Sequence, residues 1–183
     1  MAITAEERTS LVSLLVGMFD AAPNAELMTA FVDRLNDGDT VTDIANDLDD
    51  TAEFNAIYPS WLTNEEFAAR FVTNILDGNA SAEVVEAGTE AVEDILAGGA
   101  SRGGTIEIAV NFLMNVDPAD DSYGQAAQAL MNKTAVAEYF AVNLLDAETS
   151  MDTLTAVLED VDSTEDSVTE AQALIDLGVF SED

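Results

Sequence analysis

The stretch TAEERTSLVSLLVGMF, residues 4–19, decides the fold class of this chain. It opens with Thr4 and Glu7, which have the spacing of a capping box, where each side chain accepts a hydrogen bond from a backbone N–H at the start of a helix. Apolar residues follow at intervals of three and four, which places them on one helical face. These residues are Leu11, Leu14, Leu15, Met18 and Phe19. The stretch therefore predicts an α-helix that buries this face.

The same helical pattern continues along the rest of the chain. Thr63 and Glu66 form a second capping box, and Thr40 and Thr164 are expected to cap two further helices. The run 105–110 also alternates like a strand, but it has no evident partner strand, so we expect a helix. Further helices are expected at 27–35, 41–48, 54–57, 63–76, 81–96, 105–114, 125–131, 135–144, 150–158 and 164–177. The predicted fold is all-α, a compact bundle of about 8–11 short helices.

The order of helices and turns suggests a weak internal repeat. Residues 16–54 and 71–113 both read as a helix, a turn containing Pro or Gly, a second helix, a Gly-containing turn and a further helix. The period is about 55 residues, and each unit is a helical hairpin that cannot bury its apolar face alone. We therefore divide the chain into a first repeat unit, a second unit and a C-terminal helical segment, expected to form one compact domain. Their ranges are 1–62, 63–116 and 117–183.

The charge balance excludes several classes of function. The 183 residues include 37 acidic and only five basic side chains, a formal net charge of −32, and they contain no His and no Cys. Such a surface repels phosphate, which argues against nucleic-acid partners and anionic lipid. Without His and Cys the chain lacks the commonest general base, the thiolate nucleophile and the usual zinc ligands. It is not a disordered acidic chain, because 48% of its residues are apolar.

No stretch reaches the ~20 apolar residues that a membrane span requires, so no membrane insertion is predicted. The longest apolar stretch, residues 11–19, is interrupted by Ser13 and Gly17. Glu6 and Glu7 precede it where a signal peptide would be positive, so we read it as the first helix. Three explanations of the acidic surface remain open: a salty habitat, calcium binding outside the cell, or solubility alone.

Several strings in the sequence carry a family resemblance. They span about three quarters of the chain, and the most distinctive of them is residues 133–140, KTAVAEYF, which follow Asn132. The others are residues 15–24, residues 31–35 with Gly38, Glu53–Phe54, Ile57–Tyr58–Pro59, Leu62–Thr63 and Glu66–Phe67–Ala68. Together they resemble the N-terminal helical region of bacterial surface-layer proteins and of large haemolysin-type calcium-binding secreted proteins.

That resemblance implies an extracellular protein, exported by the type I route, whose helical module serves surface attachment or self-assembly where calcium is present. The chain departs from fuller members of the family, because the glycine- and aspartate-rich nonapeptide calcium repeats are absent from this sequence. Direct calcium binding of that kind is therefore in doubt.

Three runs of oxygen-bearing side chains are the candidate metal ligands. Ca²⁺ prefers six to eight oxygen ligands on a tight loop, and each run lies near an expected turn. The runs are Asn36, Asp37 and Asp39; Asp117, Asp120 and Asp121; and Asp160 and Asp162, with Glu165 and Asp166 nearby. None has the spacing of a helix–loop–helix calcium motif, and each is also what helix caps and solvated loops contain. Sites shared between subunits are a further alternative.

Two aromatic residues are the candidate ligand-binding pair. Tyr58 and Trp61 flank Pro59–Ser60 and could present a sugar-binding face, or Trp61 could instead pack a corner between two helices. Paired carboxylates alone do not identify a glycosidase in so acidic a chain.

Lys133, the chain's only lysine, lacks a reason for the lowered pKa that a nucleophilic amine needs, so we expect a surface or ion-pair role. The Gly-rich run 101–105, which contains Arg102, could cradle an anion or be a plain connector. We assign no catalytic residue and do not expect an enzyme.

The sequence thus favours an extracellular structural protein that self-assembles into a surface layer, filament or matrix, with divalent cations, Ca²⁺ above all, assisting contacts in a homo-oligomer. The alternative is a module that anchors a larger secreted calcium-binding protein to a cell-surface polysaccharide.

Overall fold

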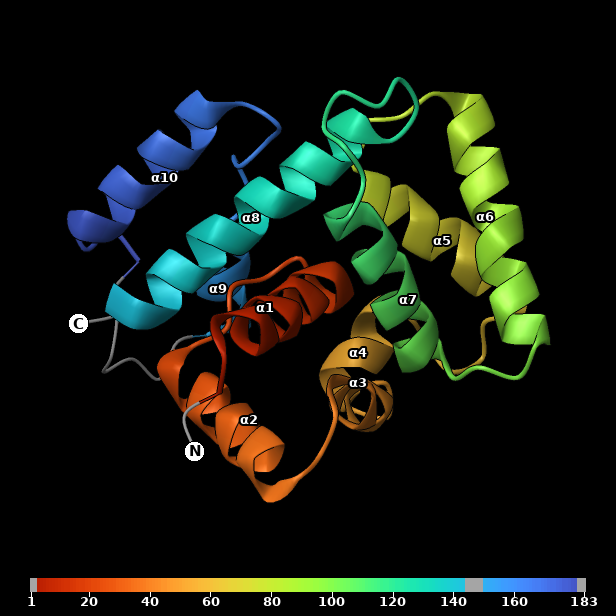
Figure 1. Ribbon diagram of the computed structural model, residues 1–183, viewed down its shortest axis with the longest axis horizontal. Coiled ribbons are helices and arrows are strands. Elements are labelled where there is room, and N and C mark those ends of the chain that lie inside the picture. Colours follow the sequence, from red (N-terminus) through yellow and green to blue (C-terminus); the bar gives the residue numbers. More distant parts are fainter. Residues whose placement is uncertain (1–2, 144–149, 181–183) are drawn as a thin grey trace.

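The computed structural model describes residues 3–143 and 150–180, and within these ranges the secondary structure consists of ten α-helices. The expectation of an all-α fold is confirmed. The helices are α1 Ala5–Phe19, α2 Ala25–Asp37, α3 Val41–Leu48, α4 Ala52–Ile57, α5 Asn64–Leu76, α6 Ala82–Ala97, α7 Arg102–Met114, α8 Gly124–Asn143, α9 Met151–Ala156 and α10 Glu165–Asp176 (Figure 1).

Side-chain caps explain where the helices begin. Every described helix except α8 starts after a Ser, Thr or Asn whose side chain accepts a hydrogen bond from a backbone N–H in the first turn. The expected capping boxes at Thr4 and Thr63 are both present, and Thr40 forms a third with Asp43. The helix starts are therefore defined by local sequence, because each cap acts on its own first turn.

Helix α8 differs from its prediction. The sequence suggested separate helices at 125–131 and 135–144, but the structure has one 20-residue helix, Gly124–Asn143. The polar residues between them, Asn132 to Thr134, do not interrupt the helix. Thr134 donates to the Leu130 carbonyl one turn back, and the other two side chains reach partners on neighbouring elements. Figure 1 shows α8 crossing the molecule between α10 and α1.

Helix α1 is the centre of the core rather than an amphipathic cover. Leu11, Leu14 and Met18 on the predicted face are at most 1% exposed, and Ser13 on the opposite side is 1% exposed as well. The helix contacts α3, α4, α7 and α8, so it is surrounded by other helices. A helix that is apolar all round is buried on all sides, which is the case here.

An aromatic cluster joins the range 1–62 to the range 63–116. Phe54 of α4 and Tyr58 just after it pack against Phe67 and Phe71 of α5, with ring centroids 5.1 to 6.5 Å apart. Phe19 at the end of α1 meets Phe54 edge to face at 6.4 Å. Such rings bury large apolar areas and stabilise the junction of α1, α4 and α5.

The repeat stays a prediction, but the ranges 1–62 and 63–116 share one turn feature. In both units the first helix ends at an aspartate in the left-handed conformation, Asp20 after α1 and Asp77 after α5. The second helix then begins after a cap, Asn24 or Ser81, and the third helices, α3 and α7, pack against each other. Contacts of α1 with α7 and α8 join all three ranges in one core.

No helix within the described ranges has both the length and the apolar character needed to cross a membrane.

Candidate functional site

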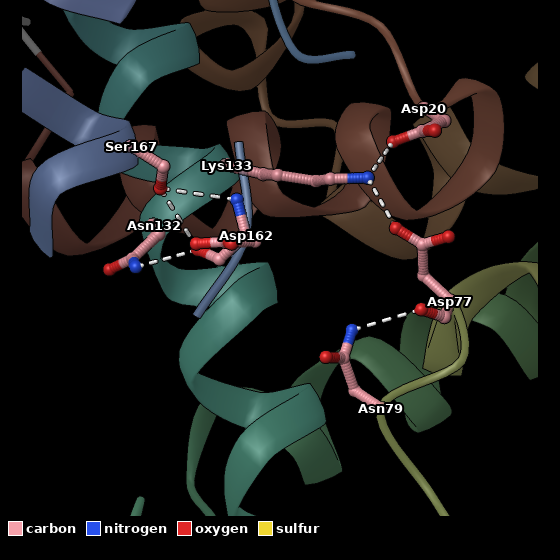
Figure 2. Close-up of polar contacts among 7 residues, drawn as sticks. All are labelled: Asp20, Asp77, Asn79, Asn132, Lys133, Asp162 and Ser167. Atoms are coloured by element: carbon pink, nitrogen blue, oxygen red, sulfur yellow. Dashed lines mark hydrogen bonds and ion pairs between the residues drawn. The ribbon is translucent and has the colours of Figure 1, made fainter. Parts of the chain in front are cut away.

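The most unusual side chain in the described structure is Lys133, because it is the only buried charged residue there, 7% exposed. Its ammonium group donates to Asp20 Oδ1 at 2.8 Å and to Asp77 Oδ2 at 3.2 Å (Figure 2). A single cation on α8 therefore holds the ends of α1 and α5, the corresponding helices of the two repeat units. We call Asp20, Asp77 and Lys133 the lysine clamp.

The two aspartates are placed by unusual backbone geometry. Asp20 has φ 48° and Asp77 has φ 44°, the left-handed region that most side chains avoid and that Asp tolerates better than most. This conformation turns the chain sharply after each helix and aims each carboxylate at Lys133. The backbone N–H of each aspartate still bonds a carbonyl of its own helix, Val16 or Thr73.

The electrostatics of the clamp fix the charge state of the lysine. Burial lowers the pKa of Lys133, but the charges and hydrogen bonds of Asp20 and Asp77 outweigh burial and raise it above the ordinary value. The amine is therefore protonated at neutral pH and is no nucleophile. The expected ion-pair role is confirmed, whereas a surface position for Lys133 is wrong.

The neighbouring residue on α8 holds a third segment. Asn132 donates to the Asp162 carbonyl at 2.8 Å, in the loop before α10 (Figure 2). It also donates to the Thr164 carbonyl at 3.1 Å. Ser167 closes that loop, since its hydroxyl bonds the Thr164 carbonyl at 2.8 Å and accepts from the Asp162 N–H at 3.2 Å. The adjacent residues Asn132 and Lys133 thus make the middle of α8 a junction between three segments of the chain.

Two hollows lie beside the clamp, and the smaller of them is lined mainly by acidic side chains. A hollow of about 590 Å³ lies among the ends of α1 and α5 and the middle of α8. A smaller one of about 350 Å³ adds Asp152 and Glu159 to Asp20, Asp77 and Lys133. Because the lysine is already paired with two carboxylates, anionic ligands are repelled from these hollows.

The Gly-rich run 101–105 does cradle an anion, and that anion belongs to the chain itself. Gly103 N–H donates to Asp49 Oδ2 at 2.8 Å, so a carboxylate from the end of α3 sits at the N-terminus of α7. The helix begins at Arg102, three residues earlier than expected, after its cap Ser101. A free phosphate would have to displace Asp49.

The side chain of Arg102 also makes its contacts within the molecule. Its guanidinium donates to the carbonyls of Pro59 and Leu62 and lies 4.9 Å from the centre of the Phe67 ring. These contacts hold both ends of the turn between α4 and α5. Trp61, within that turn, is 75% exposed.

The two residues of the candidate sugar-binding pair lie in different environments, Tyr58 in the core and Trp61 at the surface. Tyr58 is 2% exposed, and its hydroxyl accepts a hydrogen bond from Asn74 at 3.2 Å. Burial raises the pKa of its phenol. A surface role for Tyr58 is wrong, because its ring completes the aromatic cluster, and the corner-packing alternative for Trp61 is wrong as well. Trp61 alone can face a ligand.

The first candidate metal run is partly neutralised by a cation. Asn36 and Asp37 are exposed at the end of α2, and Gly38 ends the helix with φ 110°. Asp39 pairs with Arg34 Nε at 2.6 Å, and the same guanidinium reaches Asp47 at 2.6 Å. The arginine, which sequence spacing did not associate with this run, competes with any metal ion for Asp39.

The second run shapes the loop before α8. Asp117 accepts from the Ala119 N–H, and Asp120 accepts from the N–H groups of Ser122 and Tyr123. These backbone bonds lower the pKa of Asp120. Asp120 and Asp121 border a polar hollow of about 530 Å³.

In the third run, Asp162 forms a local turn with Thr164, whose N–H and hydroxyl it accepts at 2.7 and 2.6 Å, and this lowers the pKa of Asp162. Asp160 is exposed. Across residues 3–143 and 150–180, no three carboxylates gather closely enough to hold a metal ion. The role of Ca²⁺ stays a prediction.

Comparisons with models of protein families, with curated proteins and with solved structures find no match for this chain.

Proposed function

We propose that this protein is an extracellular structural protein that assembles with copies of itself through contacts assisted by divalent cations. The observation that carries the proposal is the sorting of charge between interior and surface. Lys133 is buried, and Arg34 and Arg102 are half-buried in contacts within the molecule, so only Arg8 and Arg70 are exposed. In contrast, every carboxylate of the described residues is exposed or half-buried.

This sorting has a direct consequence for contacts between copies. Arg34, Arg102 and Lys133 have partners within the molecule, so only Arg8 and Arg70 are exposed to neutralise the many carboxylates of a neighbouring molecule. Two such surfaces repel one another unless counterions lie between them, and monovalent salt only screens that repulsion. A divalent cation can instead bind carboxylates of two molecules at once, and oxygen-rich loops are its preferred ligands. The exposed runs at 36–39, 117–121 and 160–162 are therefore proposed as halves of shared sites.

The experiment compares the purified chain in millimolar calcium and in chelator by electron microscopy and thermal melting. We expect sheets, fibres or regular particles and a higher Tm in calcium, and dispersed monomers in chelator, because an ion that binds only the folded assembly stabilises it. The control is sodium chloride at the same ionic strength, which screens the repulsion between copies but cannot bridge their carboxylates. Identical particles and identical melting in calcium and chelator would contradict the proposal.

A second candidate function rests on Trp61. Its ring is 75% exposed on a turn whose ends are held by Arg102, which suits stacking against an apolar sugar face. The chain would then act as a module that anchors to a cell-surface polysaccharide. Titration with such a polysaccharide should change the fluorescence of Trp61, the chain's only tryptophan, and Trp61→Ala should remove binding without altering assembly in calcium. An unchanged fluorescence would reject this candidate.

A further inference from the structure

An apolar groove lies between α6 and α7, with α5 as its floor. Its volume is about 270 Å³, and it is lined almost wholly by apolar side chains, among them Ile75, Ala91, Ile95, Ile108 and Phe112. Helix α6 lies at the edge of the molecule in Figure 1, where its described contacts are with α5 and α7. The groove is separate from the lysine clamp and from the three candidate metal runs.

Small residues on α6 keep the groove open. Gly88 comes so close to α5 that an added Cβ would lie 3.1 Å from Val72 Cγ1, and Ala91 one turn later leaves space above the floor. On the opposite wall Ile108 and Phe112 are one helical turn apart and are 48% and 53% exposed. Phe112 is held edge to face against Tyr123, with ring centroids 5.3 Å apart. Two large apolar side chains exposed side by side along a groove mark an interaction surface.

The charges around the groove indicate what can approach it. Helix α6 carries five acidic residues, Glu83, Glu86, Glu90, Glu93 and Asp94, and its sequence includes no basic residue. Glu93 is half-buried, and the other four are exposed. Arg102, the basic residue of α7, is turned toward the α4–α5 turn, as described above. A partner must therefore bring an apolar stripe flanked by positive charge.

We propose that this groove binds a basic amphipathic helix of another protein. A helix fits because Ile108, Phe112 and the α6 wall form an elongated apolar trough, which accepts side chains spaced three and four residues apart. Lys or Arg on the flank of such a helix would meet Asp94, which lies one helical turn after Ala91 at the edge of the groove. A second copy of this chain is a poorer occupant, since it would set one acidic helix against another. The inference is independent of the proposed self-assembly.

The test uses two labelled helical peptides with the same leucine stripe, one with lysine and one with glutamate on the polar face. Fluorescence anisotropy at physiological salt should show binding of the lysine peptide only. Ile108→Ser and Phe112→Ser should each weaken it about tenfold, the loss typical of an anchor contact. The control is Val142→Ser on α8, a site 54% exposed and outside the groove, which should leave the affinity unchanged. Circular dichroism establishes that each variant is folded.

Three results would overturn the proposal. One is failure of the lysine peptide to bind the wild-type protein. Another is equal binding by wild type, Ile108→Ser and Phe112→Ser, which would mean attraction to acidic surface alone. The third concerns self-association of the protein, measured by sedimentation without peptide. If Phe112→Ser abolishes self-association, the groove binds a second copy of this chain and not another protein. If the wild-type protein binds the lysine peptide but does not assemble in calcium, the proposed function is rejected and this inference still holds.

Discussion

At the scale of single residues, the molecule depends on one buried cation. Removing Lys133 from water is costly, and two charge-assisted hydrogen bonds offset that cost. A capping box is local, so its presence at Thr4 could be predicted from sequence alone. The lysine clamp could not, because it joins residues from three distant segments. One feature of the sequence hinted at it: an aspartate, Asp20 or Asp77, follows the predicted first helix of each repeat unit.

We predict that Lys133→Met lowers the free energy of unfolding by about 1–3 kcal/mol, the range for charged hydrogen bonds. The loss should stay below the ~3–5 kcal/mol typical of a broken, fully buried pair, because the side chains of Asp20 and Asp77 are 61% and 60% exposed and remain hydrated. Urea denaturation measures the difference. Arg70→Met removes the same charge from an exposed position and should change stability by less than about 0.5 kcal/mol. Equal effects of the two substitutions would show that the clamp contributes nothing.

We further predict that the contribution of Lys133 is lost in alkali. Its pKa is raised in the folded protein, so its stabilising effect is fully present below the unfolded-state value of ~10.4 and disappears as the pH rises through the folded value. The stability difference between wild type and Lys133→Met should therefore shrink above about pH 10.4. Tyr58, whose pKa burial raises, acts in both proteins and cancels. A difference that stays constant from neutral pH to strong alkali would contradict this assignment.

At the scale of helices, the closest approach of two elements is the crossing of α3 and α7. A Cβ built on Gly103 would lie 2.0 Å from the Ala45 carbonyl oxygen, so the backbones touch and only glycine fits. Asp49 from α3 bonds the Gly103 N–H at the same point. The sequence showed the glycines but not their use, because a glycine run before a helix is equally typical of a loose connector or an anion site.

We predict that Gly103→Ala destabilises the protein by about 1–3 kcal/mol, as overpacking does, despite the gain of ~1 kcal/mol in helix propensity. Gly98→Ala is the matched control. Gly98 has φ −70°, which alanine adopts freely, and it lies at the exposed end of α6. It should be neutral or slightly stabilising in the same thermal melts. Comparable stability of both variants would show that α3 and α7 can separate at no cost.

Helix boundaries show where sequence reasoning succeeds and where it stops. Starts with a Ser, Thr or Asn cap were predictable, because the cap acts on its own first turn. The split of α8 into two helices was wrong because Asn132 and Lys133 look like a polar break in sequence. In the structure both side chains have partners on other elements, so tertiary contacts remove the reason for a break.

At the scale of the whole molecule, charge is divided between inside and outside. The all-α class and the acidic surface follow from composition and periodicity, whereas the use of Lys133, Arg34 and Arg102 within the molecule follows from the three-dimensional arrangement. The candidate metal residues were predicted as runs. Structure shows that Asp39, Asp120 and Asp162 have internal hydrogen-bond partners and that their runs lie at the surface.

The most direct test of cation-assisted assembly is sedimentation velocity at constant ionic strength, with calcium replaced stepwise by sodium. Because bridging needs a divalent ion, we predict large species in calcium and a return to monomer when calcium is chelated. A single monomeric boundary under every condition, or association that follows ionic strength and ignores the identity of the cation, would contradict the account.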